Sequence, residues 1–404
     1  MGGVFDQWLL RKICDSIGAA PVRIEIEGGA SDAAPGVSPE FTVYIRDRKT
    51  LRELVLDPEV GFGEAYSDGR VRVEGDLTRF LEAVYRSWPS GENRGWHARA
   101  VSAWLELWQN NSLRGSRKNI HHHYDLGNDF YRLWLDRQLV YTCAYYPSPE
   151  MSLEDAQIAK MDHVCRKLQL QPGESVVEAG CGWGALALHM ARHYGVRVKA
   201  FNISHEQIEW AQRRAEDEGL ARQVEFIEDD YRNISSGFDV FVSVGMLEHV
   251  GRKHYAEFAG VIHRAIGKRG RGLLHFIGRS YRNPFSRWIR KRIFPGAYAP
   301  ALAEAMEILE RYRYDVLDVE NLRLHYAHTC EQWLDRFENV RAAITAKYGD
   351  WFARAWRLYL AGSVAGFSTD TLQLFQIVFA GPHSPPPAMT RAHLYESQCE
   401  SSIS

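Results

Sequence analysis

The chain has 404 residues, of which 45% are hydrophobic and 25% are charged, and its formal net charge is −2. This length and composition exclude a disordered or fibrous protein and favour a small domain beside a larger one. The near-zero charge excludes general attraction to nucleic acid, so an anionic partner would have to be met by a local basic patch.

The six cysteines, at positions 14, 143, 165, 181, 330 and 399, form no CxxC pair and no regular framework. This spacing predicts free thiols in a reducing cytoplasm and no zinc site. Asp6 and Arg11 interrupt the apolar run that a signal peptide needs, and Asp6 stands where a myristoylation motif requires Ser or Thr. No run approaches the roughly 20 apolar residues of a membrane-spanning helix.

Residues 1–110 predict a small α+β domain. The stretches VRIEIEG, FTVYIRD and RVRVEG alternate as half-buried strands do. LTRFLEAVYRSW predicts a helix capped by Asp76. The polar stretch NNSLRGSRKN indicates a linker over residues 111–122.

From Ser152 onward, strands and helices alternate regularly. A helix with apolar Met161, Cys165 and Leu168 comes first, and the expected strands are SVVEAG, VRVKAFNI, VEFIEDD, DVFVSVG, GLLHFIG and, near the end, LQLFQIVFA. This alternation predicts an α/β fold with a doubly wound, Rossmann-like parallel sheet within a domain at 123–382. Residues 383–404 are expected to form a loose tail.

A glycine-rich turn, Glu178-Ala-Gly180-Cys181-Gly182-Trp-Gly184-Ala, follows the first of these strands. It formally satisfies the dinucleotide fingerprint, but a nicotinamide enzyme also needs an acid about 20 residues further on, and the next strand ends Phe-Asn-Ile-Ser. The turn therefore favours S-adenosylmethionine, which has no pyrophosphate and whose ammonium Glu178 can bind. The alternative is that the glycines only permit tight packing of strand and helix.

The ordered motifs between residues 118 and 380 resemble the cyclopropane fatty acid synthase family, which includes the mycolic acid cyclopropane synthases. They are HYDLGND at 123–129, YTCAY at 141–145, EAGCGWG at 178–184, GMLEHVG at 245–251, LHFIG at 274–278 and IFPG at 293–296. Residues 1–110 are similar to the additional N-terminal domain of the longer members. The resemblance implies an S-adenosylmethionine-dependent methyltransferase that cyclopropanates unsaturated phospholipid acyl chains.

The resemblance also implies which residues contact the cofactor: Tyr141, Thr142, Glu178, Gly180, Cys181, Gly182, Gly184, Asn202, Ser204, Gln207, Asp230 and Tyr231. Ser204 and Gln207 have, in addition, the spacing of a helix capping box. Both roles are compatible, because the N-terminus of that helix lies where the ligand would lie.

Methylation of an alkene needs a strong electrophile held in line, and it produces a carbocation that a dry site must protect. A base then removes a proton from the new methyl group to close the ring. The resemblance implies that this base is a bicarbonate ion, held by the main chain of Cys143 and Ile277 and the side chains of Glu248, His275 and Tyr326.

Each of these residues has a structural alternative. Cys143 is compatible with a small buried hydrophobe, His275 with a satisfied core histidine, and Tyr326 with core packing. Glu248 is compatible with a surface turn, although it follows a central strand on the side where α/β sheets bind ligands.

Ser363 stands where many members of the family carry Cys, which puts ring closure in question more than methyl transfer. The second hypothesis is therefore C-methylation to a methyl- or methylene-branched chain. A non-catalytic lipid-binding protein is the third, and the joint presence of Glu248, His275 and Tyr326 argues against it.

The segment Arg279–Phe294 is rich in cations and aromatic residues. From Asn283 it predicts a short helix with Pro at its first position, with Phe285, Trp288 and Ile289 on one face and cations beside them. This pattern is typical of an interfacial helix and predicts peripheral contact with anionic phospholipid. A solvated basic helix, or one whose aromatics pack on the sheet, is the alternative.

Two further points concern partners. The histidines at 121–123 do not predict a metal site, because adjacent side chains alternate in direction along an extended chain. The sequence leaves a homodimer open.

Overall fold

The computed structural model describes residues 2–34, 36–87, 126–283 and 285–395, so the predicted linker, the histidines at 121–123 and Cys399 lie outside the described residues. The chain forms two compact units. The first comprises residues 1–109, 284–295 and 326–372, and the second comprises residues 110–283, 296–325 and 373–404. The structure thus differs from the predicted boundaries by adding two later segments to the first unit.

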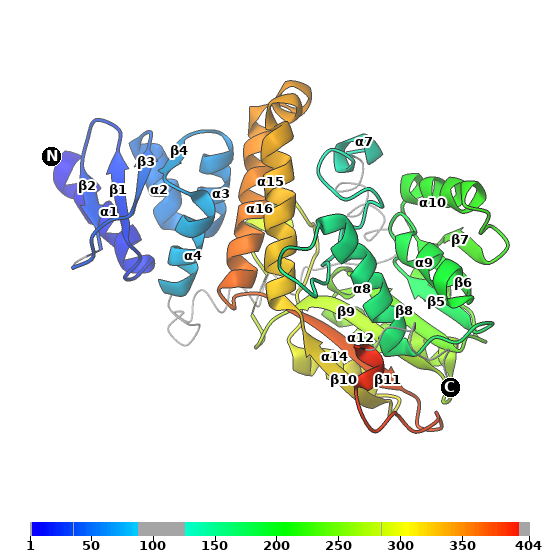
Figure 1. The fold of residues 1–404 in the computed structure, drawn as a ribbon. Coiled ribbons are helices and arrows are strands. Elements are labelled where there is room, and N and C mark those ends of the chain that lie inside the picture. Colours follow the sequence, from blue (N-terminus) through cyan, green and yellow to red (C-terminus); the bar gives the residue numbers. More distant parts are fainter. Residues whose placement is uncertain (1, 35, 88–125, 284, 396–404) are drawn as a thin grey trace. The chain divides into compact units, whose positions relative to one another are not determined.

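The first unit contains a four-stranded mixed sheet (Figure 1). The strands lie in the order β2 (Ser31–Ala33), β1 (Val22–Ile26), β3 (Phe41–Ile45) and β4 (Val71–Glu74). β1 and β3 are parallel, and the two outer pairs are antiparallel. In β1 and β3 the buried residues alternate as predicted, because successive side chains point to opposite faces of a strand.

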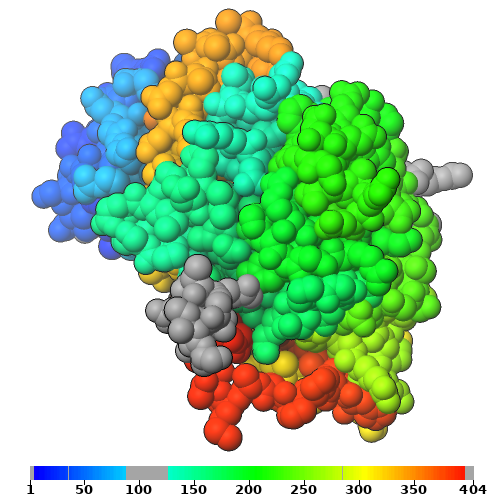
Figure 2. Space-filling view, turned by 45° about the vertical axis from the view of Figure 1, so that its right-hand side comes forward, coloured from blue at the N-terminus to red at the C-terminus, as the bar shows by residue number. Residues whose placement is uncertain are grey.

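Seven helices accompany this sheet along the described chain: α1 (Gly2–Ser16), α2 (Arg48–Leu56), α3 (Pro58–Ser67), α4 (Leu77–Ser87), α13 (Arg287–Arg292), α15 (Arg323–Tyr348), which begins in the second unit, and α16 (Asp350–Ser368). The predicted cap of α4 is confirmed, since the Arg79 N–H donates to Asp76 Oδ1 at 2.8 Å. α16 packs on α3 and α4, so segments far apart in sequence lie side by side (blue and orange in Figure 2).

The predicted interfacial helix is α13, and it is packed inside the first unit. Its N-cap is Ser286, whose Oγ accepts the Ile289 N–H at 3.3 Å, rather than Asn283. Trp288 is 4% exposed, and a Cβ on Gly63 of α3 would lie 2.3 Å from its ring. The cations pair with acids of the same unit: Arg287 with Asp57, and Lys291 and Arg292 with Glu64. Trp288 is therefore packed on α3 within the first unit, and membrane contact by the segment Arg279–Phe294 stays a prediction.

The second unit is built on a seven-stranded sheet with the order β10-β11-β9-β8-β5-β6-β7. The strands are β5 (Ser175–Ala179), β6 (Arg197–Asn202), β7 (Val224–Glu228), β8 (Val240–Val244), β9 (Arg271–Gly278), β10 (Asp315–Asn321) and β11 (Gln373–Ala380). The five strands from β9 to β7 are parallel, which confirms the predicted α/β fold. The final strand β11 is antiparallel to β9 and β10, so the sheet is not parallel throughout.

Helices cover both faces of this sheet (Figure 1). α8 (Leu153–Leu168), α9 (Ala185–Tyr194) and α10 (His205–Asp217) pack on one face, and α12 (Tyr255–Ile266) and α14 (Leu302–Glu310) on the other. Neighbouring Val176 and Val177 of β5 belong to opposite cores. The apolar strand runs of the sequence are explained by this double coverage.

Short helices complete the second unit: α7 (Asn128–Tyr131), α11 (Leu247–Val250), η2 (Tyr231–Asn233), η3 (Arg252–His254) and η4 (Ala392–Leu394). Leu394 of η4 is 4% exposed, and Arg391 pairs with Asp318 at 3.0 Å. The predicted loose tail is therefore packed as far as η4, because Leu394 contributes to the apolar interior.

Candidate active site

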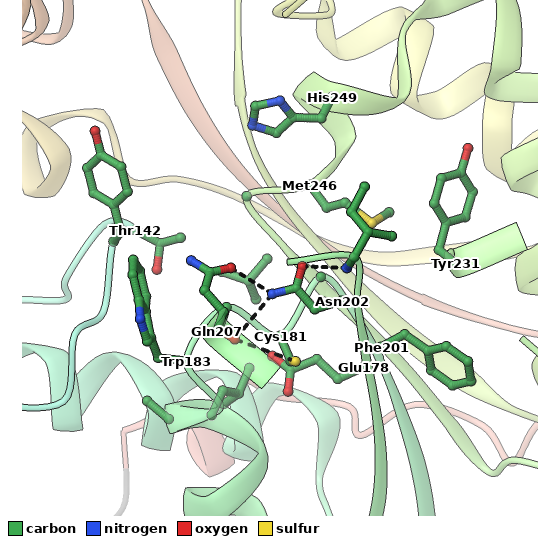
Figure 3. Close-up of a pocket in the computed structure, with 18 of the residues that line it drawn as sticks. Thr142, Glu178, Cys181, Trp183, Phe201, Asn202, Gln207, Tyr231, Met246 and His249 are labelled. Atoms are coloured by element: carbon green, nitrogen blue, oxygen red, sulfur yellow. Dashed lines mark hydrogen bonds between the residues drawn. The ribbon is translucent and has the colours of Figure 1, made fainter. Parts of the chain in front are cut away.

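A cavity of about 150 Å³ opens where the parallel strands of the second unit end (Figure 3). A single water needs about 10–15 Å³ by the same measure, so the space suits a larger ligand. Ten of the twelve predicted cofactor residues line it: Tyr141, Thr142, Glu178, Gly180, Cys181, Gly182, Asn202, Gln207, Asp230 and Tyr231. Gly184 and Ser204 do not.

The glycine-rich turn after β5 serves two purposes at different positions. Gly182 has φ +54°, and a Cβ there would meet no atom within 4 Å, so this glycine leaves space open. Gly184 has φ +82°, and a Cβ there would lie 2.5 Å from Phe226 Cζ and 2.9 Å from Ala211 Cβ. The sequence left two alternatives for these glycines, space for a cofactor or tight packing of strand and helix. The structure shows both, with open space at Gly182 and tight packing at Gly184.

Two opposite charges are buried in the wall of the cavity. Glu178 is 2% exposed, and its Oε2 has no hydrogen-bond partner among the described residues. Burial raises the pKa of this carboxyl to about 7, and the charge of Lys160 acts in the opposite direction. Lys160 of α8 is 2% exposed, and its Nζ donates to Thr142 Oγ1 at 3.1 Å. Burial lowers the pKa of Lys160 to about 8.

Lys160 was not singled out in the sequence analysis. Trp183 and His249, which lie within the motifs EAGCGWG and GMLEHVG, also line the cavity. A lone lysine in a helix normally indicates a solvated face. The available signal was its position, three residues after buried Gln157 and four before buried Val164, on the inward face of α8.

An amide pair closes one side of the cavity, at the start of α10 (Figure 3). Asn202 Nδ2 donates to Gln207 Oε1 at 2.7 Å and to the Gly182 carbonyl at 3.3 Å. Asn202 Oδ1 accepts the Ile203 N–H at 2.8 Å. Ser204 is the N-cap of α10, but its side chain makes no capping hydrogen bond. The predicted capping box is therefore wrong, because Asn202 engages the Gln207 side chain.

Asp230 and Tyr231 follow β7 on another side of the cavity. Asp230 is 3% exposed and pairs with Arg232 at 3.1 Å. The Tyr231 ring packs edge-on against Phe258 with centroids 5.5 Å apart. Burial raises the pKa of the Tyr231 hydroxyl, so this side chain stays neutral.

Glu248 and Ile277, predicted to share a site, are brought together. The Glu248 carboxyl, on α11 directly after β8, accepts the Ile277 N–H through Oε1 at 2.5 Å. Its Oε2 is buried and has no hydrogen-bond partner in the described part of the chain. Burial raises the pKa of Glu248 to about 7, although the Ile277 N–H acts to lower it.

His275 lies two residues before Ile277 on β9, so both residues face the same side of the strand. It is 2% exposed, and its Nδ1 lies 3.0 Å from Nε2 of Gln376, its cross-strand neighbour on β11. Burial lowers the pKa of His275 well below its ordinary value, so the ring is neutral. If Gln376 donates to Nδ1, the ring proton resides on Nε2, which has no partner among the described residues.

The remaining predicted site residues are Cys143, Tyr326 and Ser363. The Cys143 thiol is fully buried and contacts the Ala144 carbonyl at 3.1 Å. Tyr326 of α15 and Ser363 of α16 belong to the first unit. The Tyr326 ring stacks on Phe367 with centroids 4.5 Å apart, and Ser363 Oγ donates to the Tyr359 carbonyl at 2.9 Å. Their predicted place beside Glu248 stays a prediction.

Among the described residues, no three His, Cys, Asp or Glu side chains gather as metal ligands would. In those same ranges, every helix is too short or too polar to cross a membrane. Five cysteines are buried and form no disulfide with one another: Cys14, Cys143, Cys165, Cys181 and Cys330.

A seven-stranded α/β sheet with a glycine-lined cavity at the ends of its parallel strands defines the class of Rossmann-like S-adenosylmethionine-dependent methyltransferases. Within that class, the chain belongs to the mycolic acid cyclopropane synthetase family, whose model matches residues 111–377. A domain family of unknown function matches residues 9–93.

Individual relatives match most of the chain. The cyclopropane-fatty-acyl-phospholipid synthase of Escherichia coli (strain K12) is 34% identical over 360 residues, covering 88% of this chain and 92% of that protein. A probable fatty acid methyltransferase of Pseudomonas putida is 32% identical over 376 residues, covering 90% and 93%. The solved structure of mycolic acid cyclopropane synthase CmaA1 complexed with SAH and CTAB has a TM-score of 0.62 and 29% identity, covering 65% of this chain and 97% of that one.

Proposed function

We propose that this protein transfers the methyl group of S-adenosylmethionine to the cis double bond of an unsaturated phospholipid acyl chain and closes a cyclopropane ring. The observation that carries the proposal is the cavity beside β5, with the buried Glu178 carboxyl in its wall. Similarity to the E. coli synthase over nearly its whole length supports the substrate class. We also propose that the protein acts from the cytoplasm, peripherally associated with the membrane that presents these chains.

The cavity suits S-adenosylmethionine in chemistry as well as in position. Gly182 leaves room for the ligand, and Glu178 Oε2 is a buried acceptor that has no hydrogen-bond partner within the described ranges, as an ammonium group requires. When bound, this cofactor supplies an electrophilic methyl group on a sulfonium. The chain contributes orientation, and it excludes water that would trap the carbocation formed on the acyl chain.

We propose that Cys143, Glu248, His275 and Ile277 hold a bicarbonate ion, and the resemblance implies the same role for Tyr326. Glu248 Oε2 and His275 Nε2 are buried polar atoms without partners in the described structure, and they suit an anion that offers both a hydroxyl and acceptor oxygens. The Ile277 N–H already donates to Glu248, so this amide would have to exchange its acceptor. The bound ion would supply the base for ring closure, and loss of one such donor costs about 3 kcal/mol in the barrier.

The second candidate is methylation without ring closure, which would give a methyl- or methylene-branched chain. Ser363 favours it: the resemblance implies a Cys at this position in many members of the family, whereas the Ser363 hydroxyl donates to the Tyr359 carbonyl. Similarity to the P. putida probable fatty acid methyltransferase also supports it.

The test is incubation with methyl-labelled S-adenosylmethionine and vesicles of mono-unsaturated phospholipid, followed by NMR of the released acyl chains. We expect label in the chains, loss of olefinic protons and cyclopropane signals, all strongly reduced in Glu248→Gln. An exocyclic methylene or a methyl branch would establish the second candidate. Absence of label from the lipid would contradict both.

A further inference from the structure

Lys160 is a buried ammonium group that none of the roles above uses. It lines the cavity from α8, and its Nζ donates to Thr142 Oγ1 at 3.1 Å. Burying a charged lysine costs free energy unless neighbouring charges and hydrogen bonds compensate. Its retention in the wall of the cavity therefore calls for charged partners there.

Among the described residues, the groups that act most strongly on the charge of Lys160 are Asp136, Cys143, Glu178 and Cys165. Asp136 is already engaged, since its carboxylate accepts the N–H groups of Gln138 and Val140 at 2.9 and 2.8 Å. Burial raises the pKa of Cys165 well above its ordinary value, so this thiol is neutral. Glu178 lines the same cavity, and its Oε2 accepts no hydrogen bond from the part of the chain that the structure describes, so it is the acid whose charge Lys160 can support.

We infer that Lys160 is a positioning residue of the cofactor site, which keeps Glu178 ionised and orients the Thr142 hydroxyl. The inference rests on the proposed function, in which the Glu178 carboxylate binds the ammonium of the cofactor. A buried carboxyl without a nearby cation takes up a proton and then binds a cation poorly. Lys160 opposes this tendency, because its charge stabilises the carboxylate before the cofactor arrives.

The pKa of Glu178 sets an acidic limb for cofactor binding. This pKa is about 7, so the carboxylate that binds the ammonium is lost as the pH falls below that value. Among the described residues, Lys160 supplies the charge that lowers the pKa of Glu178, and Lys160 is itself charged below its own pKa of about 8. Its removal in Lys160→Met should therefore move the acidic limb to higher pH, whereas Lys160→Arg, which keeps the positive charge, should leave the limb in place.

The experiment is calorimetric titration of the full chain with S-adenosylhomocysteine, which has the same ammonium but is not turned over, between about pH 6 and 9. Lys167→Met is the matched control, because Lys167 is buried on the same helix but pairs with Glu320 at 2.6 Å and does not line the cavity. We expect Lys160→Met to weaken binding at least tenfold at pH 7, with the difference from the wild type narrowing as the pH rises. Lys167→Met should keep the wild-type profile.

A Lys160→Met profile that superimposes on that of the wild type would overturn the inference alone. If this variant does not fold, Lys160→Arg provides the test, since an acidic limb that moves although the positive charge is kept would overturn the inference as well. A wild-type chain that does not bind S-adenosylhomocysteine would instead overturn the proposed function, and the inference with it.

Discussion

Gly182 and Gly184, two residues apart in one turn, should respond differently to the same substitution. Both have positive φ, so alanine at either position costs about 1–2 kcal/mol of backbone strain. At Gly184 the new Cβ would also lie 2.5 Å from Phe226 Cζ and 2.9 Å from Ala211 Cβ, which adds about 1–3 kcal/mol of overpacking. We therefore expect Gly184→Ala to lose about 2–5 kcal/mol of folding free energy, or roughly 4–20 °C in Tm.

At Gly182 the new methyl group would meet no protein atom and would occupy space at the cavity. The stability loss should stay near the strain cost of about 1–2 kcal/mol. A bound cofactor would meet the methyl group, and overpacking of about 1–3 kcal/mol corresponds to about 5- to 150-fold weaker binding.

The assay pairs thermal unfolding of both variants with calorimetric titration by S-adenosylhomocysteine. Gly184→Ala should be the less stable protein, and Gly182→Ala should bind the ligand more weakly at a temperature where both are folded. Tight binding by Gly182→Ala would show that this part of the turn does not face the cofactor. Wild-type stability of Gly184→Ala would refute the packing of the turn on Phe226.

Three further substitutions test individual side chains. Glu248→Gln should lower turnover at least tenfold with little change in cofactor affinity. Because the pKa of Glu248 is about 7, kcat of the wild type should rise with pH through that value, and this rise should be absent from the variant. Gln376→Leu should lower turnover about as much as His275→Ala while leaving cofactor affinity intact, since Gln376 is the observed partner of the imidazole Nδ1; unchanged turnover would exclude this role. Glu320→Gln tests the stability of the protein. In the folded chain, ion pairs hold the pKa of Glu320 at about 2, below its unfolded value of about 4.5. The stabilisation by this carboxylate is therefore present above pH 4.5 and is lost as the pH falls towards 2. Because burial lowers the pKa of its partner Lys167, we expect a net difference of about 1–3 kcal/mol in urea unfolding at pH 7, which disappears near pH 2.

Local patterns predicted most elements of the second unit, because its strands are continuous apolar runs and its helices have a regular period. They did not predict that β11 runs antiparallel, since a strand buried on both faces has the same composition in either direction. Nor could local patterns predict that Trp288 packs against Gly63, because the two residues lie in segments more than 200 residues apart.

The site residues also fall into those that local patterns predicted and those that they did not. The turn from Glu178 to Gly184 was predictable because its glycines are required by backbone geometry. Lys160 and Gln376 were not, because a single lysine in a helix or glutamine in a strand belongs to no local motif. Their positions have meaning only once α8 and β11 are packed beside the strands they contact.

The number of deuterium atoms in the product reports on ring closure. Vesicles of mono-unsaturated phospholipid would be incubated with S-adenosylmethionine whose transferable methyl group is fully deuterated, and the acyl chains analysed by mass spectrometry and NMR. We expect acyl chains that gain a ring carbon bearing two deuterium atoms, the third having been removed by the base. Acyl chains without deuterium, or with all of it in a methyl group, would contradict ring formation by this protein.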